Sequence, residues 1–216
     1  KLTLEEYLAV DRSKMEKDDR REILDALAWM VRLHRGQMRQ SGEPYHTHPL
    51  EVAHLMEKVI EEGRLDTTLI LVALLHDIME ECDVFFEQIN GAFGWDVAWL
   101  VDCLSKKESQ TDEGYFQQIR EGIKDDWRVL FLKLADNIHN LETLSFLILE
   151  KQLAFVKESR EAYLPMARQF KPQVPQRYHA LLDDWLRKIE ELVARPFAPP
   201  RPCLVLLEGE TPTIIL

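Results

Sequence analysis

The chain has 216 residues, of which 46% are hydrophobic, so it is long enough for one domain with a sizeable core. Its formal net charge is −11 without a compensating block of Lys or Arg, which argues against a nucleic-acid partner because nucleic-acid-binding surfaces are basic. The longest unbroken apolar run, residues 69–75, is far shorter than the roughly 20 residues that cross a bilayer, so we expect a cytoplasmic protein with no membrane partner.

Apolar residues recur at helical spacing along most of the chain, which predicts an all-α fold. The first long helix is expected over residues 18–38, before a turn rich in Gly and Pro. The next helix has Pro49 in its first turn and is expected to end at Gly63. A third helix is expected to start near Thr67 and to continue through Glu81. Later helices are expected over residues 84–93, 95–104, 112–124, 127–144, 147–169 and 174–194.

The last part of the chain has a different composition. Residues 1–195 are expected to form the helical domain, and residues 196–216 a Pro-rich linker and a C-terminal tail. The tail sequence "LVLLEGETPTIIL" holds two apolar runs around a Gly-containing turn. This pattern favours a small β-hairpin, either on the helical body or paired with a partner chain. The sequence leaves a homo-oligomer open.

The apolar run ends abruptly in "ALLHDIMEE", where four ionisable residues follow: His76, Asp77, Glu80 and Glu81. In a continuous helix, residues 76 and 80 share one face, and residues 77 and 81 share the neighbouring face. The helix dipole disfavours carboxylates at a C-terminal end. Three acidic groups there therefore predict a compensating cation, and a plain solvated helix end is the alternative for this stretch alone.

A second carboxylate interrupts the apolar helix "FLKLADNIHNLETL". Asp136 has Asn140 and Thr143 on its own face, and Lys133 precedes it by three residues. A buried, ionised Asp is costly unless it is paired or binds a cation, so a metal ligand and a hydrogen-bonded Asp are both open. His139 lies about 60° around the helix from Asp136 and is expected to make a structural hydrogen bond.

A third segment, "SGEPYHTHP", places His48 before Pro49, with His46 as a rival candidate. The candidate metal ligands share nitrogen or oxygen donors and come from three helical segments: His48, His76, Asp77 and Asp136. Such a mixed set suits manganese, iron or another octahedral divalent cation better than structural zinc, which favours Cys. Glu80 and Glu81, one turn beyond the ligands, would then orient or deprotonate a water molecule.

Three stretches of the chain, "HRGQMRQSGEPYHTHPLEVA", "ALLHDIMEE" and "RVLFLKLADNIHNLETL", resemble the hydrolase domain of RelA/SpoT-type alarmone enzymes, which are HD-domain metal phosphohydrolases. The resemblance covers residues 28–144. It implies a helical bundle in which the four candidate ligands hold one manganese ion and Glu80 and Glu81 activate water. It also implies removal of pyrophosphate from the 3′ position of guanosine tetra- and pentaphosphate, giving GDP or GTP. The chain looks like a stand-alone small alarmone hydrolase or the hydrolase part of a longer enzyme.

The resemblance extends to the candidate substrate contacts. The residues at nucleotide-contacting positions are Arg39, Ser41, Asn140 and Thr143. Lys133 is a further candidate, because its side chain can cover the face that carries Asp136.

Several positions depart from the family pattern. Gln40 stands where Lys is frequent, Glu81 replaces the commoner Asp, and Asn137 and Glu142 occupy positions that are usually basic. His46 stands where an apolar residue is usual. The lost positive charges leave open an adenosine alarmone or another nucleotide as substrate. A catalytically weak module that only binds the alarmone is the remaining alternative.

Overall fold

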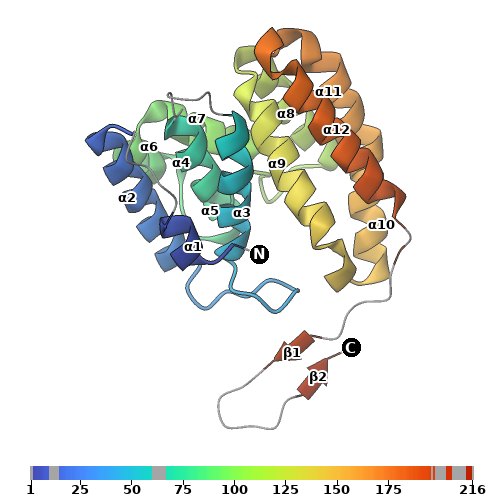
Figure 1. Ribbon diagram of the computed structural model, residues 1–216, viewed down its shortest axis with the longest axis horizontal. Helices are drawn as coiled ribbons and strands as arrows, with labels where there is room; N and C mark the ends of the chain where they lie inside the picture. The colour runs from blue at the N-terminus through green and yellow to red at the C-terminus, as the bar shows by residue number, and fades with distance from the viewer. Residues whose placement is uncertain are drawn as a thin grey trace.

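The computed structural model describes residues 2–9, 15–59, 67–195 and 197, together with the backbone of residues 203–205 and 213–215. The helices are α1 (Leu4–Leu8), α2 (Lys17–Leu33), α3 (Thr47–Met56), η1 (Glu57–Val59), α4 (Thr67–Leu75), α5 (Ile78–Glu81), α6 (Phe86–Phe93), α7 (Trp95–Leu104), α8 (Asp112–Asp125), α9 (Arg128–Glu142), η2 (Leu144–Phe146), α10 (Leu149–Glu158), the π-helix η3 (Ser159–Tyr163), α11 (Leu164–Phe170), η4 (Lys171–Gln173), η5 (Gln176–Tyr178) and α12 (His179–Ala194). The predicted all-α class is confirmed (Figure 1).

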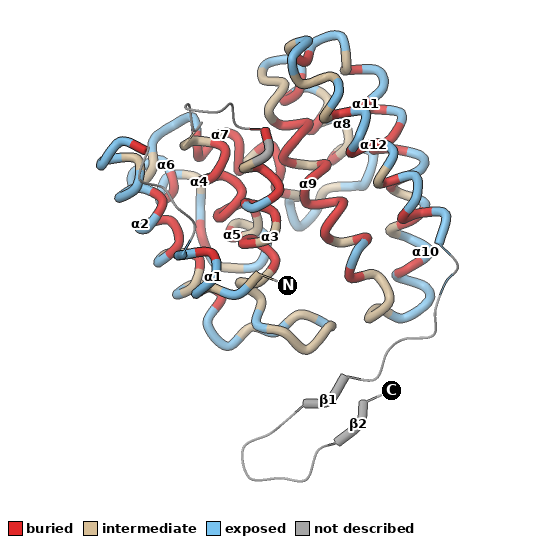
Figure 2. Tube along the Cα trace, in the orientation of Figure 1, coloured by how far each residue is buried: buried red, intermediate tan, exposed pale blue. Residues whose placement is uncertain are grey.

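α4 forms the centre of the N-terminal half. Its residues Leu69–Leu75 are all buried, with at most 2% of any of them exposed, as expected of a helix that is apolar on every side. α2, α3 and α7 pack around it, and Figure 2 shows the burial along its length. The C-terminal end of α4 is therefore fixed in position by the surrounding core.

α9 is the central helix of the C-terminal half, where it packs against α8 and α12. It also packs against α3, and Figure 1 shows the two helices side by side at the junction of the two halves. Residues from the turn before α3, from the end of α4 and from the middle of α9 thereby meet in space.

Two predicted helices differ in their ends. α2 ends at Leu33 instead of Met38, and Gly36, with a positive φ of 81°, is in a conformation in which the chain cannot continue as a right-handed helix. The predicted helix over residues 147–169 is interrupted by the π-helix Ser159–Tyr163. The predicted helix end at Gly63 lies outside the described residues.

The prediction of one continuous helix through "ALLHDIMEE" is wrong. α4 ends at Leu75 and α5 begins at Ile78, so the break falls on His76 and Asp77. The imidazole Nδ1 of His76 lies 2.8 Å from the carbonyl oxygen of Ala73, which is the acceptor that the Asp77 N–H would use in a continuous helix. The predicted helix faces, one shared by residues 76 and 80 and one by residues 77 and 81, therefore do not form.

The tail contains strands β1 (Cys203–Val205) and β2 (Thr213–Ile215). They pair antiparallel, with Cys203 opposite Ile215, as the two apolar runs predicted. The division into a domain of residues 1–195 and a tail stays a prediction. Among the described residues, no helix combines the length and the apolarity needed to cross a membrane.

Candidate metal centre and cleft

A cleft of about 490 Å³ opens where α3, α5, α9 and α10 meet. It is lined by every residue that the sequence predicted for the site: Arg39, Ser41, His48, His76, Asp77, Glu80, Glu81, Lys133, Asp136, Asn140 and Thr143. Segments that are far apart in the chain thus contribute to one surface. The individual roles of these residues stay predictions.

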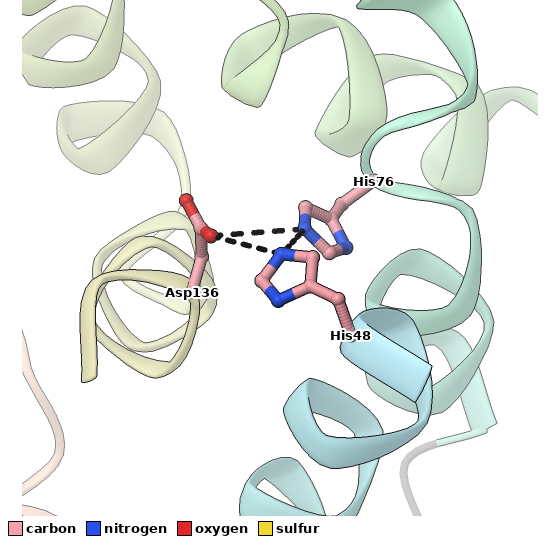
Figure 3. A group of neighbouring side chains, drawn as sticks. All are labelled: His48, His76 and Asp136. Carbon is pink, nitrogen blue, oxygen red and sulfur yellow. Dashed lines mark hydrogen bonds and ion pairs between the residues drawn. The ribbon is translucent and has the colours of Figure 1, made fainter. Parts of the chain in front are cut away.

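Three buried side chains form a compact group at the floor of the cleft. Ligand atoms of His48, His76 and Asp136 all lie within 4.8 Å of one another. The Nε2 of His48 is 3.2 Å from Oδ1 of Asp136 and 3.2 Å from Nε2 of His76. Figure 3 shows these atoms converging from α3, from the turn between α4 and α5, and from α9.

Asp77 lies beside this group and contacts both histidines. Its Oδ1 is 3.1 Å from Nε2 of His76, and its Oδ2 is 3.4 Å from Nε2 of His48. The hydroxyl of Tyr45 donates a hydrogen bond of 2.8 Å to the same Oδ2. The rival candidate His46 is half-buried at the start of α3 and does not belong to the group.

The chemistry of the group fits a divalent cation. The carbonyl of Ala73 can only accept, so a neutral His76 ring carries its proton on Nδ1 and presents a lone pair on Nε2. The carboxylates of Asp77 and Asp136 are also acceptors. Buried acceptors that face one another without a donor are unfavourable unless a proton or a cation lies between them. The mixed nitrogen and oxygen set is one that divalent transition metals accept.

The electrostatics of His76 lead to the same conclusion. Burial alone would lower its pKa, but the carboxylates of Asp77 and Asp136 outweigh burial and raise the pKa to about 9. The two carboxylates therefore stabilise a positive charge at Nε2 of His76. A bound cation would supply this charge in place of the proton.

Asp136 is held from its own helix. The Nζ of Lys133 lies 2.9 Å from Oδ2, and Asn140 Nδ2 donates a 2.6 Å hydrogen bond to Oδ1. Burial raises the pKa of Asp136, but Lys133, His48 and His76 together outweigh burial, so the pKa lies well below its usual range. Lys133 itself sits between the rings of Tyr115 and Tyr163, at 5.3 Å from each centroid. Its nearest anionic partner is therefore a predicted metal ligand.

The two glutamates lie on the short helix α5 at the edge of the cleft. Oε1 of Glu80 accepts a 2.8 Å hydrogen bond from the backbone N–H of Lys106. The surrounding protein desolvates this carboxyl and raises its pKa. The backbone carbonyl of Glu81 accepts a 2.9 Å hydrogen bond from Gln37, whose side chain also bonds His34 at 2.7 Å. α5 is thus tied to the segments on either side.

The predicted substrate contacts differ in how their polar atoms are used. Arg39 Nη2 donates a 2.7 Å hydrogen bond to Oδ1 of Asn140, and the hydroxyl of Thr143 donates to the carbonyl of His139 at 3.1 Å. The buried hydroxyl of Ser41 has no hydrogen-bond partner among the described residues. An unpaired buried hydroxyl costs free energy. Ser41 is therefore a predicted substrate contact whose hydroxyl is still able to form a hydrogen bond.

Several lining or supporting residues were not predicted from the sequence. They are Tyr45, Tyr115, Glu158 and Tyr163, all of which line the cleft. Tyr45 directly precedes the candidate ligands His46 and His48 in the sequence, and this proximity is a signal that could have identified it. Tyr115 and Tyr163 have no polar motif beside them in the sequence, and only the packing of α8 and η3 brings them near Lys133.

Known proteins resemble this chain in sequence. A family model described as "HD domain" matches residues 26–170. The chain is 32% identical to a GTP pyrophosphokinase rsh of Brucella melitensis, over 91% of this chain and 26% of the relative. It is 40% identical to a guanosine-3′,5′-bis(diphosphate) 3′-pyrophosphohydrolase of Vibrio cholerae, over 62% of this chain and 19% of the relative.

The fold also has a counterpart among solved structures. A metazoan ortholog of SpoT that hydrolyzes ppGpp superposes with a TM-score of 0.61 at 23% identity, over 77% of this chain and 94% of that chain. At this level of identity the match establishes the fold alone. The chain spans about a quarter or less of the length of the two curated relatives above.

Proposed function

The chain belongs to the HD-domain family, and we propose that it is a metal-dependent hydrolase that removes pyrophosphate from the 3′ position of guanosine tetra- and pentaphosphate. The products would be GDP or GTP and pyrophosphate. The observation that carries this proposal is the buried group of His48, His76 and Asp136 at the floor of the cleft. The similarity to a named 3′-pyrophosphohydrolase supports the choice of substrate.

His48, His76, Asp77 and Asp136 would hold the cation, for which manganese is the proposed identity. When bound, a divalent cation supplies Lewis-acid polarisation of phosphoryl oxygen and lowers the pKa of water. The residues contribute the rest. Lys133 and Asn140 fix the Asp136 carboxylate, and the Ala73 carbonyl fixes the ring of His76.

Glu80 and Glu81 are proposed to orient the attacking water and take its proton. The raised pKa of Glu80 makes it a better proton acceptor than an ordinary carboxylate, and its hydrogen bond to Lys106 N–H fixes its direction. The bond between the 3′ oxygen and phosphorus breaks as the water oxygen bonds to that phosphorus. The proton passes from water to Glu80, which later returns it to solvent, and the 3′ oxygen takes up a proton from solvent as it leaves as the hydroxyl of GDP or GTP.

The nucleotide would lie along the cleft above this group. Ser41 would donate or accept the hydrogen bond that it lacks, and Arg39 would offer its guanidinium as a fork or a stacking surface. Three further side chains are proposed contacts with fewer free donors or acceptors, because each already bonds a protein group: Asn140, Thr143 and Lys133.

A second candidate substrate is an adenosine alarmone or another nucleotide. The observation that favours it is the chemistry at two positions. Gln40 is uncharged, and the side-chain amide of Asn137 donates a 2.8 Å hydrogen bond to Ser159. A cleft with fewer cations holds a highly anionic nucleotide less strongly. A module that binds without turnover is the remaining candidate.

The test is chromatography of the products after incubation of the purified protein, with manganese, against guanosine and adenosine tetraphosphate. The proposal expects GDP and pyrophosphate from the guanosine substrate. Faster turnover of the adenosine substrate would instead favour the adenosine alarmone as the substrate. Tight binding in calorimetry without product would favour the binding module.

A further inference from the structure

His139 is a buried residue, 5% exposed, to which the proposed function assigns no role. It lies on α9 between Asp136 and Thr143. Its Nδ1 is only 2.6 Å from Nδ1 of His48, a separation at which one hydrogen must lie between the two nitrogens. One imidazole therefore donates and the other accepts.

The direction of this hydrogen bond decides what His48 can do. If His48 donates from Nδ1, its Nε2 carries a lone pair toward His76 and Asp136. If His48 accepts, a neutral ring must carry its proton on Nε2, where it points at Oδ1 of Asp136, 3.2 Å away. Only the first arrangement leaves a ligand. Figure 3 shows the second ring nitrogen of His48 turned away from the group.

We propose that His139 is a positioning residue that accepts the Nδ1–H of His48 and so holds the tautomer whose Nε2 can bind a cation. The inference rests on the proposed metal site. The Ala73 carbonyl performs the same task for His76, at 2.8 Å. For a metal-binding histidine, an acceptor on its other nitrogen fixes the tautomer and the orientation of the ring.

This arrangement links two ligands to one helix. α9 carries Asp136, and through His139 it also sets the direction of His48, which comes from α3. The backbone carbonyl of His139 is already engaged by the N–H and the hydroxyl of Thr143, at 3.2 and 3.1 Å. The imidazole is therefore the acceptor that this part of α9 offers to His48.

Two substitutions separate the proposed role from simple packing. His139→Asn places an amide oxygen near the former position of Nδ1 and keeps an acceptor. His139→Leu fills similar space without one. Calorimetric titration of the metal-free proteins with Mn²⁺ should give an affinity about 10–100-fold weaker for His139→Leu. The affinity of His139→Asn should remain near that of the wild type.

The tautomer can be measured directly. Long-range ¹H–¹⁵N spectra of the metal-free wild type, with His48 assigned through a His48→Gln variant, should report a protonated Nδ1 and an unprotonated Nε2. A proton on Nε2 of His48, or unchanged Mn²⁺ affinity in a folded His139→Leu protein, would overturn the inference. If the wild type binds no Mn²⁺, the proposed metal site fails instead, so the two failures are distinguishable.

Discussion

At the scale of single residues, the arrangement separates groups that would hold a cation from groups that would act on water. Asp136 is buried, paired with Lys133 and in contact with His48. Glu80 lies at the edge of the cleft, where its carboxylate accepts a hydrogen bond from the backbone N–H of Lys106. The two carboxylates therefore predict different consequences of removal.

Asp136→Ala should lose Mn²⁺ affinity and hydrolysis together, whereas Glu80→Gln should keep the affinity and lose about 10²–10⁴-fold in kcat. Calorimetry with Mn²⁺ and steady-state kinetics on the same preparations measure both quantities. Glu87→Gln, at an exposed position on α6, is the matched control and should change neither. Full turnover in the Glu80→Gln protein would remove Glu80 from the mechanism.

The dependence of activity on pH should report the same glutamate. Desolvation raises the pKa of Glu80 above that of an ordinary Glu, and only the ionised form can accept a proton. Activity is therefore present above the raised pKa and is lost as the pH falls through it. At saturating Mn²⁺, the acid limb of kcat should be present in the wild type and absent from the residual rate of Glu80→Gln. The same acid limb in the Glu80→Gln protein would contradict this assignment.

The substitution Gln40→Lys tests whether a positively charged side chain at this position strengthens binding of the nucleotide. Gln40 is exposed and lines the cleft, so Gln40→Lys adds charge without disturbing the core. An exposed ionic contact is worth roughly 0.2–1 kcal/mol, which corresponds to a fall of about 1.4- to 5-fold in the KM for guanosine tetraphosphate, with kcat unchanged. The gain should shrink in high salt. If KM stays the same, the substitution has no weight in specificity.

The residue types of the site were predictable, and most of their hydrogen-bond partners were not. Two histidines and two carboxylates in apolar surroundings indicate a cation from local chemistry alone. His139 was expected to make a structural hydrogen bond, but its partner His48 is far away in the chain. The bond from Tyr45 to Asp77 likewise depends on the packing of separate segments, which no local pattern encodes.

At the scale of elements, helix interruptions shape the cleft. The break between α4 and α5 lets His76 and Asp77 face the other ligands, and the π-helix η3 brings Tyr163 against Lys133. π-Helical turns are frequent at functional sites. Helical periodicity predicted the apolar faces correctly, but it could not predict these interruptions because both depend on side-chain contacts between elements or across one turn.

The π-helix is tied to α9 by a buried pair. Asn137 Nδ2 donates to Ser159 Oγ at 2.8 Å, and both residues are buried. Asn137→Ala leaves the Ser159 hydroxyl without this partner and should cost about 1–3 kcal/mol of unfolding free energy. A double-mutant cycle with Ser159→Ala, measured by urea unfolding, should give a coupling of at least about 0.5 kcal/mol.

The exposed Asn90 on α6 provides the control for this cycle. Asn90→Ala should change the unfolding free energy by no more than about 0.5 kcal/mol, and it should show no coupling with Ser159→Ala. Additivity between Asn137→Ala and Ser159→Ala would mean that the pair contributes nothing beyond the individual side chains.

At the scale of the whole molecule, two helical halves meet along α3 and α9, and the cleft opens at this junction. The fold class followed from the periodicity of the sequence. The contact between α3 and α9 did not, because many pairings of amphipathic helices bury similar apolar area. The site thus depends on tertiary packing even though each of its residues lies in a recognisable local motif.

The described residues that line the cleft lie between Met38 and Tyr163, and on this basis we expect the tail, residues 196–216, to be dispensable. A chain that ends after Arg195 should keep the Mn²⁺ affinity, the turnover and the thermal midpoint of residues 1–216. Kinetics and thermal unfolding of the two chains measure this. Loss of turnover in the shortened chain would instead give residues 196–216 a part in the site.

The central claim is that water attacks the 3′-linked phosphorus in this cleft. The most direct measurement is hydrolysis of guanosine tetraphosphate in H₂¹⁸O with Mn²⁺, followed by mass spectrometry of both products. The account predicts one ¹⁸O atom in the pyrophosphate, none in the GDP, and no reaction after the metal is chelated. Labelled GDP, release of orthophosphate, or an intact substrate in the presence of bound Mn²⁺ would contradict it.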